Sequence, residues 1–112
     1  MKIYHNPRCT KSRQTLALIE AAGITPEIIN YLENVPSKAE LLDLLMKLNL
    51  KPVDLLRKRE TAYKKIIKGK NFGDEELIQI MIENPKLIER PIVVRGNKAV
   101  LGRPPENVEE LF

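Results

Sequence analysis

The chain has 112 residues, of which 43% are hydrophobic and 30% charged, and it carries a formal net charge of +4. This composition is typical of a single folded domain with a packed core, and it excludes an intrinsically disordered chain. No apolar run approaches the ~20 residues of a membrane span, Met1 to His5 is too short and polar-flanked for a signal peptide, and a single cysteine excludes an internal disulfide.

These exclusions predict a reducing, cytoplasmic setting. One cysteine and one histidine leave too few soft ligands for a zinc site, so we expect no metal. The positive charge would suit a nucleic acid or a small anion, but aromatic residues make up only 4% of the chain. Because stacking platforms are then scarce, nucleic acid is not expected as a partner.

The first third of the chain predicts a strand, a helix and a second strand. Lys2-Ile3-Tyr4 has the pattern of a short strand, and Ser12 to Ala22 has apolar residues at helical spacing, with Gly23 as its stop. Residues 27–32 include β-branched side chains and predict the second strand. A unit of this kind makes its two strands parallel.

The middle of the chain predicts helices with recognisable start and stop signals. Ser37 with Glu40 forms a capping box, and Asp74 is expected to cap a later helix. Asn49 and Gly69 are expected helix ends. The predicted helices cover about 37–49, 52–56, 63–68 and 74–84.

The end of the chain predicts an antiparallel hairpin and a terminal helix. Arg90 to Val94 is the third expected strand, Gly96-Asn97 the turn, and Lys98 to Leu101 the fourth strand. Pro104-Pro105 suits the first turn of the terminal helix.

The stretch from His5 to Arg13 holds the only cysteine, Cys9, between the first strand and the first helix. Unpaired N–H groups and the positive end of the helix dipole favour a thiolate there, and Arg8 and Lys11 add positive charge. A thiolate at such a turn is a nucleophile, and the same N–H groups can hold an oxyanion. The alternative is that Cys9 is a small buried hydrophobe, but its neighbours are polar and basic.

Five segments, in order along nearly the whole chain, resemble those of the glutaredoxin-linked arsenate reductases, whose fold is thioredoxin-like. They are His5-x3-Cys9-x3-Arg13, Tyr31-Leu32-Glu33-Asn34, Leu55-Leu56-Arg57-Lys58, Arg90-Pro91-Ile92-Val93-Val94 and Arg103-Pro104. The resemblance implies an α/β, thioredoxin-like fold in one domain, residues 1–112. Its four-strand mixed sheet would carry a helical insertion over about 35–88, and Pro91 would be a cis proline.

The resemblance also implies the chemistry. Cys9 matches the nucleophile, and His5 and Ser12 match residues that support the thiolate. The oxyanion would be held by three arginines, Arg57, Arg90 and Arg103. Arsenate would be reduced to arsenite with glutathione as co-substrate and glutaredoxin as partner, and no bound cofactor is expected. With no second cysteine, the chain needs an external thiol for any turnover that oxidises Cys9.

Each of these roles has a simpler alternative in the sequence. His5 could only hydrogen-bond a carbonyl, and Ser12 could be an ordinary residue of a helix N-terminus. Arg57 stands in a basic run with Arg59, and either could be the one that reaches the site.

Two other functions are compatible with the same resemblance. One is a regulator that binds RNA polymerase, but relatives of that kind generally carry a Cys-x-x-Cys switch, and here the matching positions are Cys9 and Ser12. The other is a general glutathione-dependent thiol oxidoreductase. The fold does not decide among the three.

Overall fold

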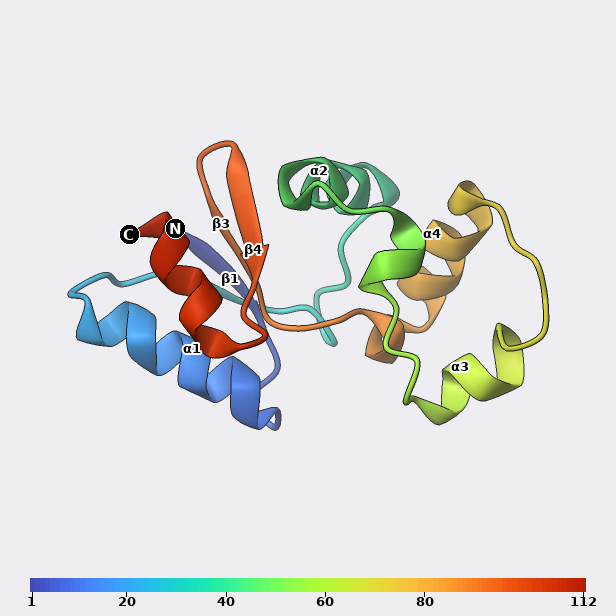
Figure 1. Cartoon of the computed structure of the whole chain (residues 1–112), viewed down its shortest axis with the longest axis horizontal. Helices are drawn as coiled ribbons and strands as arrows, with labels where there is room; N and C mark the ends of the chain where they lie inside the picture. The colour runs from blue at the N-terminus through green and yellow to red at the C-terminus, as the bar shows by residue number, and fades with distance from the viewer. The chain divides into compact units, whose positions relative to one another are not determined.

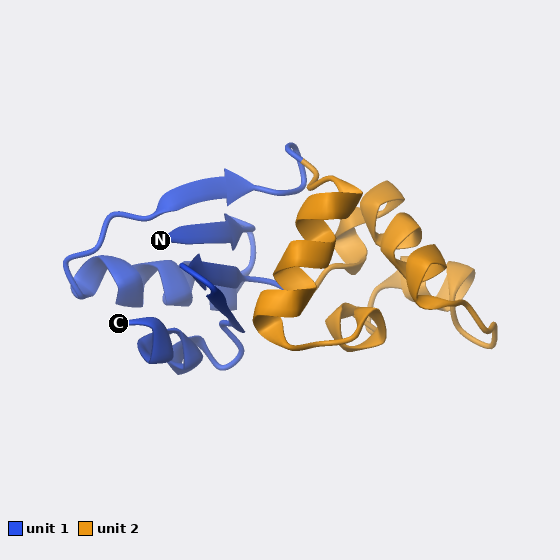
Figure 2. Cartoon of the chain, turned by 90° about the horizontal axis from the view of Figure 1, so that it is seen from above, with its two compact units in different colours: residues 1–34, 90–112 blue, residues 35–89 orange.

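The computed structural model describes all 112 residues, and the chain divides into two compact units (Figure 2). Unit 1 comprises Met1–Asn34 and Arg90–Phe112, and unit 2 comprises Val35–Glu89. The boundaries of unit 2 agree with the helical insertion expected over about 35–88. That the whole chain behaves as one domain stays a prediction.

Unit 1 is built on a four-stranded mixed sheet with the strand order β2-β1-β3-β4 (Figure 1). Strand β1 (Lys2–His5) pairs parallel with β2 (Glu27–Asn30) and antiparallel with β3 (Ile92–Arg95), which forms a hairpin with β4 (Lys98–Leu101). The parallel pair and the hairpin are therefore both confirmed. The register aligns Ile3 with Ile28 on one side and with Val93 on the other.

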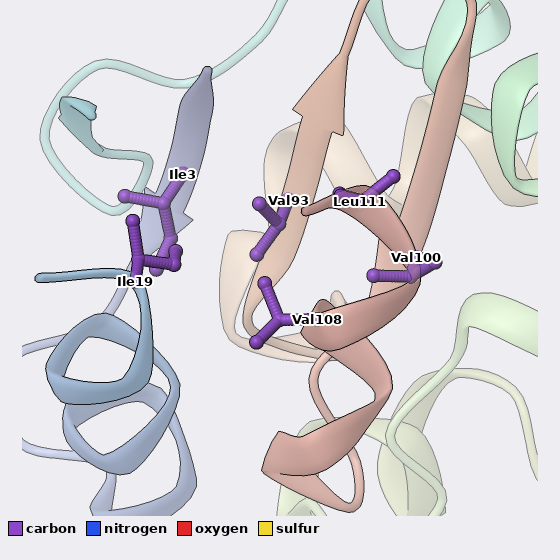
Figure 3. Packing of buried hydrophobic residues seen from close by; sticks show 6 residues of the cluster. All are labelled: Ile3, Ile19, Val93, Val100, Val108 and Leu111. Atoms are coloured by element: carbon purple, nitrogen blue, oxygen red, sulfur yellow. The ribbon is translucent and has the colours of Figure 1, made fainter. Parts of the chain in front are cut away.

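Helix α1 (Thr10–Ala21) and the 3₁₀ helix η3 (Pro105–Leu111) supply the other side of the unit 1 core. Apolar side chains of three strands and both helices pack there, as Figure 3 shows; the buried members are Ile3, Ile19, Val93, Val100, Val108 and Leu111. Burial of such side chains contributes about 1.5–3 kcal/mol each. This core fixes α1 relative to the start of β3 and the end of β4.

Unit 2 is helical, and its buried side chains come from every segment but one. It contains α2 (Lys38–Leu48), η1 (Pro52–Leu55), α3 (Thr61–Ile66), α4 (Asp74–Glu83) and η2 (Pro85–Leu87). The short helix α3 buries no residue. The remaining core is apolar, as the periodicity predicts, and includes Leu41, Leu44, Leu45, Leu55, Leu77, Ile78, Met81 and Leu87. No helix of the structure has the length and apolar character needed to cross a membrane.

The start and stop signals are partly confirmed. Ser37 caps α2 by accepting the Glu40 N–H at 3.1 Å, and Asn49 ends it in the left-handed conformation. The prediction that Asp74 caps α4 is wrong. Gly73 holds that position, because the Glu76 carboxylate reaches back to the Gly73 N–H at 3.0 Å, and Asp74 is the first helical residue.

Several predicted boundaries are also wrong, for local reasons. Helix α1 begins at Thr10, two residues before the expected start. Strand β2 ends at Asn30, because the Asn30 side chain accepts the Leu32 N–H and turns the chain. Strand β3 begins only at Ile92, since Pro91 has no N–H to donate. The basic helix α3 lies at Thr61–Ile66, and the terminal helix is of the 3₁₀ type.

Candidate functional site

Cys9 is the N-cap residue of α1, with extended backbone angles, and its side chain is partly exposed. The turn before it is closed by hydrogen bonds that the Asn6-Pro7 pair makes possible. The Cys9 N–H donates to the Asn6 carbonyl at 3.0 Å, and the Asn6 side chain accepts the Arg8 N–H at 3.0 Å. The sulfur therefore lies where the first N–H groups of the helix have no carbonyl partner.

The surroundings of Cys9 stabilise its thiolate. Burial of the sulfur raises the pKa of the thiol, but the Ser12 backbone N–H, the Arg90 guanidinium and the Lys11 backbone N–H all favour the charged form. The net result is a Cys9 pKa below the usual value of a cysteine thiol. The site thus has the electrostatics of an activated nucleophile.

His5 and Ser12 contact each other, and Ser12 also bonds the backbone of this turn. Ser12 is fully buried, its Oγ lies 2.6 Å from His5 Nδ1, and it accepts the Asn6 N–H at 3.0 Å. Burial lowers the pKa of His5, and the charge of Arg13 lowers it further, so the ring is neutral near pH 7. Ser12 favours the Cys9 thiolate through its backbone N–H, and His5 contacts the Oγ of the same residue.

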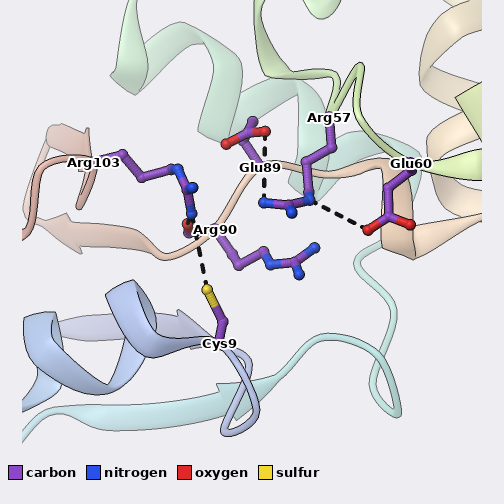
Figure 4. Close-up of polar contacts among 6 residues, drawn as sticks. All are labelled: Cys9, Arg57, Glu60, Glu89, Arg90 and Arg103. Atoms are coloured by element: carbon purple, nitrogen blue, oxygen red, sulfur yellow. Dashed lines mark hydrogen bonds and ion pairs between the residues drawn. The ribbon is translucent and has the colours of Figure 1, made fainter.

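Two arginines of unit 1 converge on Cys9. The Arg90 guanidinium lowers the pKa of the Cys9 thiol. Arg103 Nη1 lies 3.9 Å from Sγ and donates to the Arg90 carbonyl at 3.1 Å (Figure 4). Both precede a proline in a cis peptide bond, Arg90–Pro91 and Arg103–Pro104. The first cis bond agrees with the expectation from the resemblance, and the second was not expected.

Arg57 belongs to unit 2, where its own contacts are clear. Its N–H donates to the Leu87 carbonyl at 2.7 Å, which brings it beside Glu89. Its guanidinium lies 3.4 Å from the Glu60 carboxylate and 3.8 Å from that of Glu89, the two ion pairs drawn in Figure 4. Arg59 is exposed. The role of Arg57 at the oxyanion stays a prediction.

Residues that the sequence did not single out complete the site. Thr15 is fully buried, and its hydroxyl donates to the Lys11 carbonyl at 2.8 Å and approaches the Gly102 carbonyl at 3.4 Å. Asn107 of η3 donates from Nδ2 to the Leu101 and Arg103 carbonyls, both at 3.2 Å. Of these residues, only Thr15 could have been found from the sequence. It lies three residues from Ser12 and four from Ile19, which is the spacing of the buried face of α1.

Gly102 is packed too closely for any side chain. A Cβ there would contact the Thr15 hydroxyl and would lie 2.8 Å from Pro91 Cγ. Gly102→Ser is therefore expected to destabilise the fold by about 1–3 kcal/mol through overpacking. The matched control is Gly73→Ser, because a Cβ at Gly73 has its nearest neighbour at 3.5 Å and serine is a favoured N-cap. Urea unfolding curves measure both, and equal midpoints would contradict the close packing.

The groups that stabilise the Cys9 thiolate lead to a prediction about the pKa of Cys9. The pKa of Cys9, titrated by thiolate absorbance, is expected below that of a free cysteine, and Arg90→Gln is expected to raise it because one stabilising donor and charge are lost. The control is Arg95→Gln, which removes the same charge at the other end of β3. An unshifted or raised Cys9 pKa in the parent protein would show that this turn does not activate the sulfur.

The fold and this turn define the class: an α/β protein with a four-stranded mixed sheet and a partly exposed cysteine at the N-terminus of its first helix. Comparisons with known proteins agree. The sequence profile of the ArsC family matches residues 4–111. The chain belongs to the ArsC family.

Individual relatives are similar over almost their whole length. The chain is 49% identical to "Uncharacterized protein YfgD" of Escherichia coli (strain K12), over 99% of this chain and 95% of that one. It is 44% identical to an arsenate reductase of Haemophilus influenzae, covering 98% and 97%. A solved structure, an arsenate reductase from Vibrio cholerae, is 50% identical, with a TM-score of 0.94 over 99% of this chain and 96% of that chain. The α/β, thioredoxin-like fold expected from the sequence is confirmed by this similarity.

Proposed function

We propose that this protein reduces arsenate to arsenite, with Cys9 as the nucleophile and with glutathione and glutaredoxin as the source of electrons. The observation that carries the proposal is the pair of guanidinium groups, of Arg90 and Arg103, beside a thiolate-stabilising turn. The names of relatives such as the Haemophilus influenzae enzyme support arsenate as the substrate.

The residue types suit a tetrahedral oxyanion. Guanidinium groups offer paired donors in a plane and keep their charge at any physiological pH, so they can hold arsenate oxygens while the sulfur approaches arsenic. The backbone N–H groups of Lys11 and Ser12 add donors at the same helix end. Arg57 is proposed as the third arginine on the correspondence of its segment with the family, and His5 and Ser12 as residues that hold the turn.

The proposed reduction of arsenate consumes one external thiol, that of glutathione. The Cys9 thiolate attacks As(V), an S–As bond forms, and one arsenate oxygen leaves as water after taking up a proton. The glutathione thiolate then attacks the Cys9 sulfur, so the S–As bond breaks and its electron pair passes to arsenic. Arsenite, As(III), leaves, and Cys9 is oxidised to a mixed disulfide with glutathione.

An external partner must then restore Cys9, because the chain has no second cysteine. Glutaredoxin is proposed for this step: its thiolate attacks the glutathione sulfur, takes over the glutathionyl group and releases Cys9 as a thiolate. Such a cycle requires a reducing compartment, for which we propose the cytoplasm. No bound cofactor takes part.

A coupled assay tests the proposal. The protein is incubated with arsenate, glutathione, glutaredoxin, glutathione reductase and NADPH, and NADPH oxidation is followed. Oxidation that requires arsenate, glutathione and glutaredoxin together is the expected result. Turnover with thioredoxin in place of the glutathione couple would contradict the proposed electron source. Equal turnover on a glutathionylated peptide without arsenate would favour a general thiol oxidoreductase.

A further inference from the structure

Other side chains lie against three successive carbonyl groups of the segment that carries Arg103. The carbonyls of Leu101 and Arg103 accept from Asn107 Nδ2 at 3.2 Å each, and that of Gly102, between them, lies 3.4 Å from the Thr15 hydroxyl. The Gly102 N–H donates to the Pro91 carbonyl at 2.9 Å. The turn that leads from β4 into η3 is thus fixed by Asn107 and by the Pro91 carbonyl, and it is in contact with Thr15.

The Arg103 guanidinium depends on this backbone for its direction. A long arginine side chain has many rotamers, so restricting it to one of them costs conformational entropy. Its Nη1 group reaches both the Arg90 carbonyl and the Cys9 sulfur, so a small rotation of the Arg103 backbone would move it off one or both. Neither Asn107 nor Thr15 hydrogen-bonds the sulfur.

We propose that Asn107 is a positioning residue, assisted by Thr15, which fixes Arg103 against Cys9. Asn107 lies on η3 and Thr15 on α1, so side chains of two different helices contact the carbonyls before, at and after Gly102. The inference rests on the proposed function only in one respect, namely that Arg103 binds an oxyanion. The direction of Arg103 toward the sulfur can be measured without arsenate.

The test compares alkylation of Cys9 by iodoacetate, an anion, with alkylation by its neutral analogue iodoacetamide. Both reagents attack the same thiolate, so the ratio of their rate constants cancels the thiolate fraction and reports positive charge beside the sulfur. Arg103→Met is expected to lower this ratio about fivefold, the effect of one solvent-screened charge at ~4 Å. Asn107→Ala is expected to lower it by about as much, because Arg103 loses its direction.

The matched control is Asn84→Ala, which removes a bond of the same kind, from Asn84 Nδ2 to the Ile80 carbonyl at 3.0 Å, in unit 2. It is expected to leave the ratio unchanged. Thr15→Val, which removes only the hydroxyl, is expected to lower the ratio, and Thr15→Ser, which keeps it, to retain most of the parent value. If Asn107→Ala does not fold, the ratio of rate constants measured for Thr15→Val tests the proposal in its place.

A double mutant separates positioning from general destabilisation. If Asn107 acts through Arg103, then Arg103→Met with Asn107→Ala has the ratio of Arg103→Met alone. A merely structural role would lower the ratio further in the double mutant. The proposal is overturned if Asn107→Ala and Thr15→Val keep the parent ratio, or if their effects persist undiminished without Arg103.

Discussion

Cys9→Ser is expected to abolish arsenate reduction, with a loss in kcat of more than about a thousandfold, the scale on which removal of a nucleophile acts. Serine is nearly isosteric with cysteine, but its hydroxyl is a far weaker nucleophile unless a base activates it. The His5 ring bonds Ser12 and not Cys9, so no base is in place to activate a serine at position 9.

The fold should survive this change, which makes the loss interpretable. Residue 9 is the N-cap of α1, and serine is among the favoured residues there. Circular dichroism and urea unfolding should therefore match the parent protein or show slightly greater stability. Residual turnover within tenfold of the parent, in the coupled assay, would mean that the sulfur is not the nucleophile.

Arg90→Lys and Arg103→Lys are each expected to reduce kcat/KM for arsenate by about 1.5–3 kcal/mol, the scale of a hydrogen bond to a charged group. Lysine keeps the positive charge but loses the planar pair of donors that matches two oxygens of one anion. If Arg57 joins them as proposed, Arg57→Lys should cost a similar amount. The Glu60 and Glu89 carboxylates beside Arg57 would then serve to orient its guanidinium.

The controls are exposed cations of the basic run. Arg59→Lys and Lys65→Ala should change kcat/KM little, because surface charges act through a screened field. If all the substitutions behave alike, the arginines do not form a convergent site and the basic run only attracts anions. If Arg59→Lys lowers kcat/KM strongly and Arg57→Lys does not, the correspondence of the Leu55-to-Lys65 segment with the family is misassigned.

Binding of an unreactive anion tests the same arginines without turnover. Sulfate or phosphate should protect Cys9 from alkylation in the parent protein, because the groups that hold arsenate would hold these anions too. Protection should weaken in Arg90→Lys and Arg103→Lys but persist in Arg59→Lys. Uniform protection across the three variants would contradict a specific anion site.

The elements that the sequence predicts well are those with a local physical signal. The strand-helix-strand unit, the hairpin at Gly96-Asn97 and the cap at Ser37 all follow from spacing and turn chemistry, and all are confirmed. Cys9 at the start of a helix also follows from residues close to it in sequence. The boundaries of helices and strands are less predictable, because side chains such as Glu76 at the start of α4 and Asn30 at the end of β2 decide them by bonding the backbone.

Contacts between distant parts of the chain account for what the sequence does not predict. Thr15 and Gly102 are 87 residues apart, and nothing in either local sequence indicates their contact. Asn107 has an unremarkable place in a helix, and its role appears only once the two carbonyls it holds are seen together. Arg57 and Glu89 pair because the Leu87 carbonyl accepts the Arg57 N–H.

The mass of the intact protein after one round of reaction tests the central claim most directly. The reduced protein is mixed with arsenate and glutathione, without glutaredoxin, and then quenched and examined by mass spectrometry. We expect one added glutathione, located on Cys9, only when both arsenate and glutathione are present, and its removal when glutaredoxin is added. No adduct with both reagents present, or the same adduct from reduced glutathione without arsenate, would contradict reduction of arsenate through Cys9.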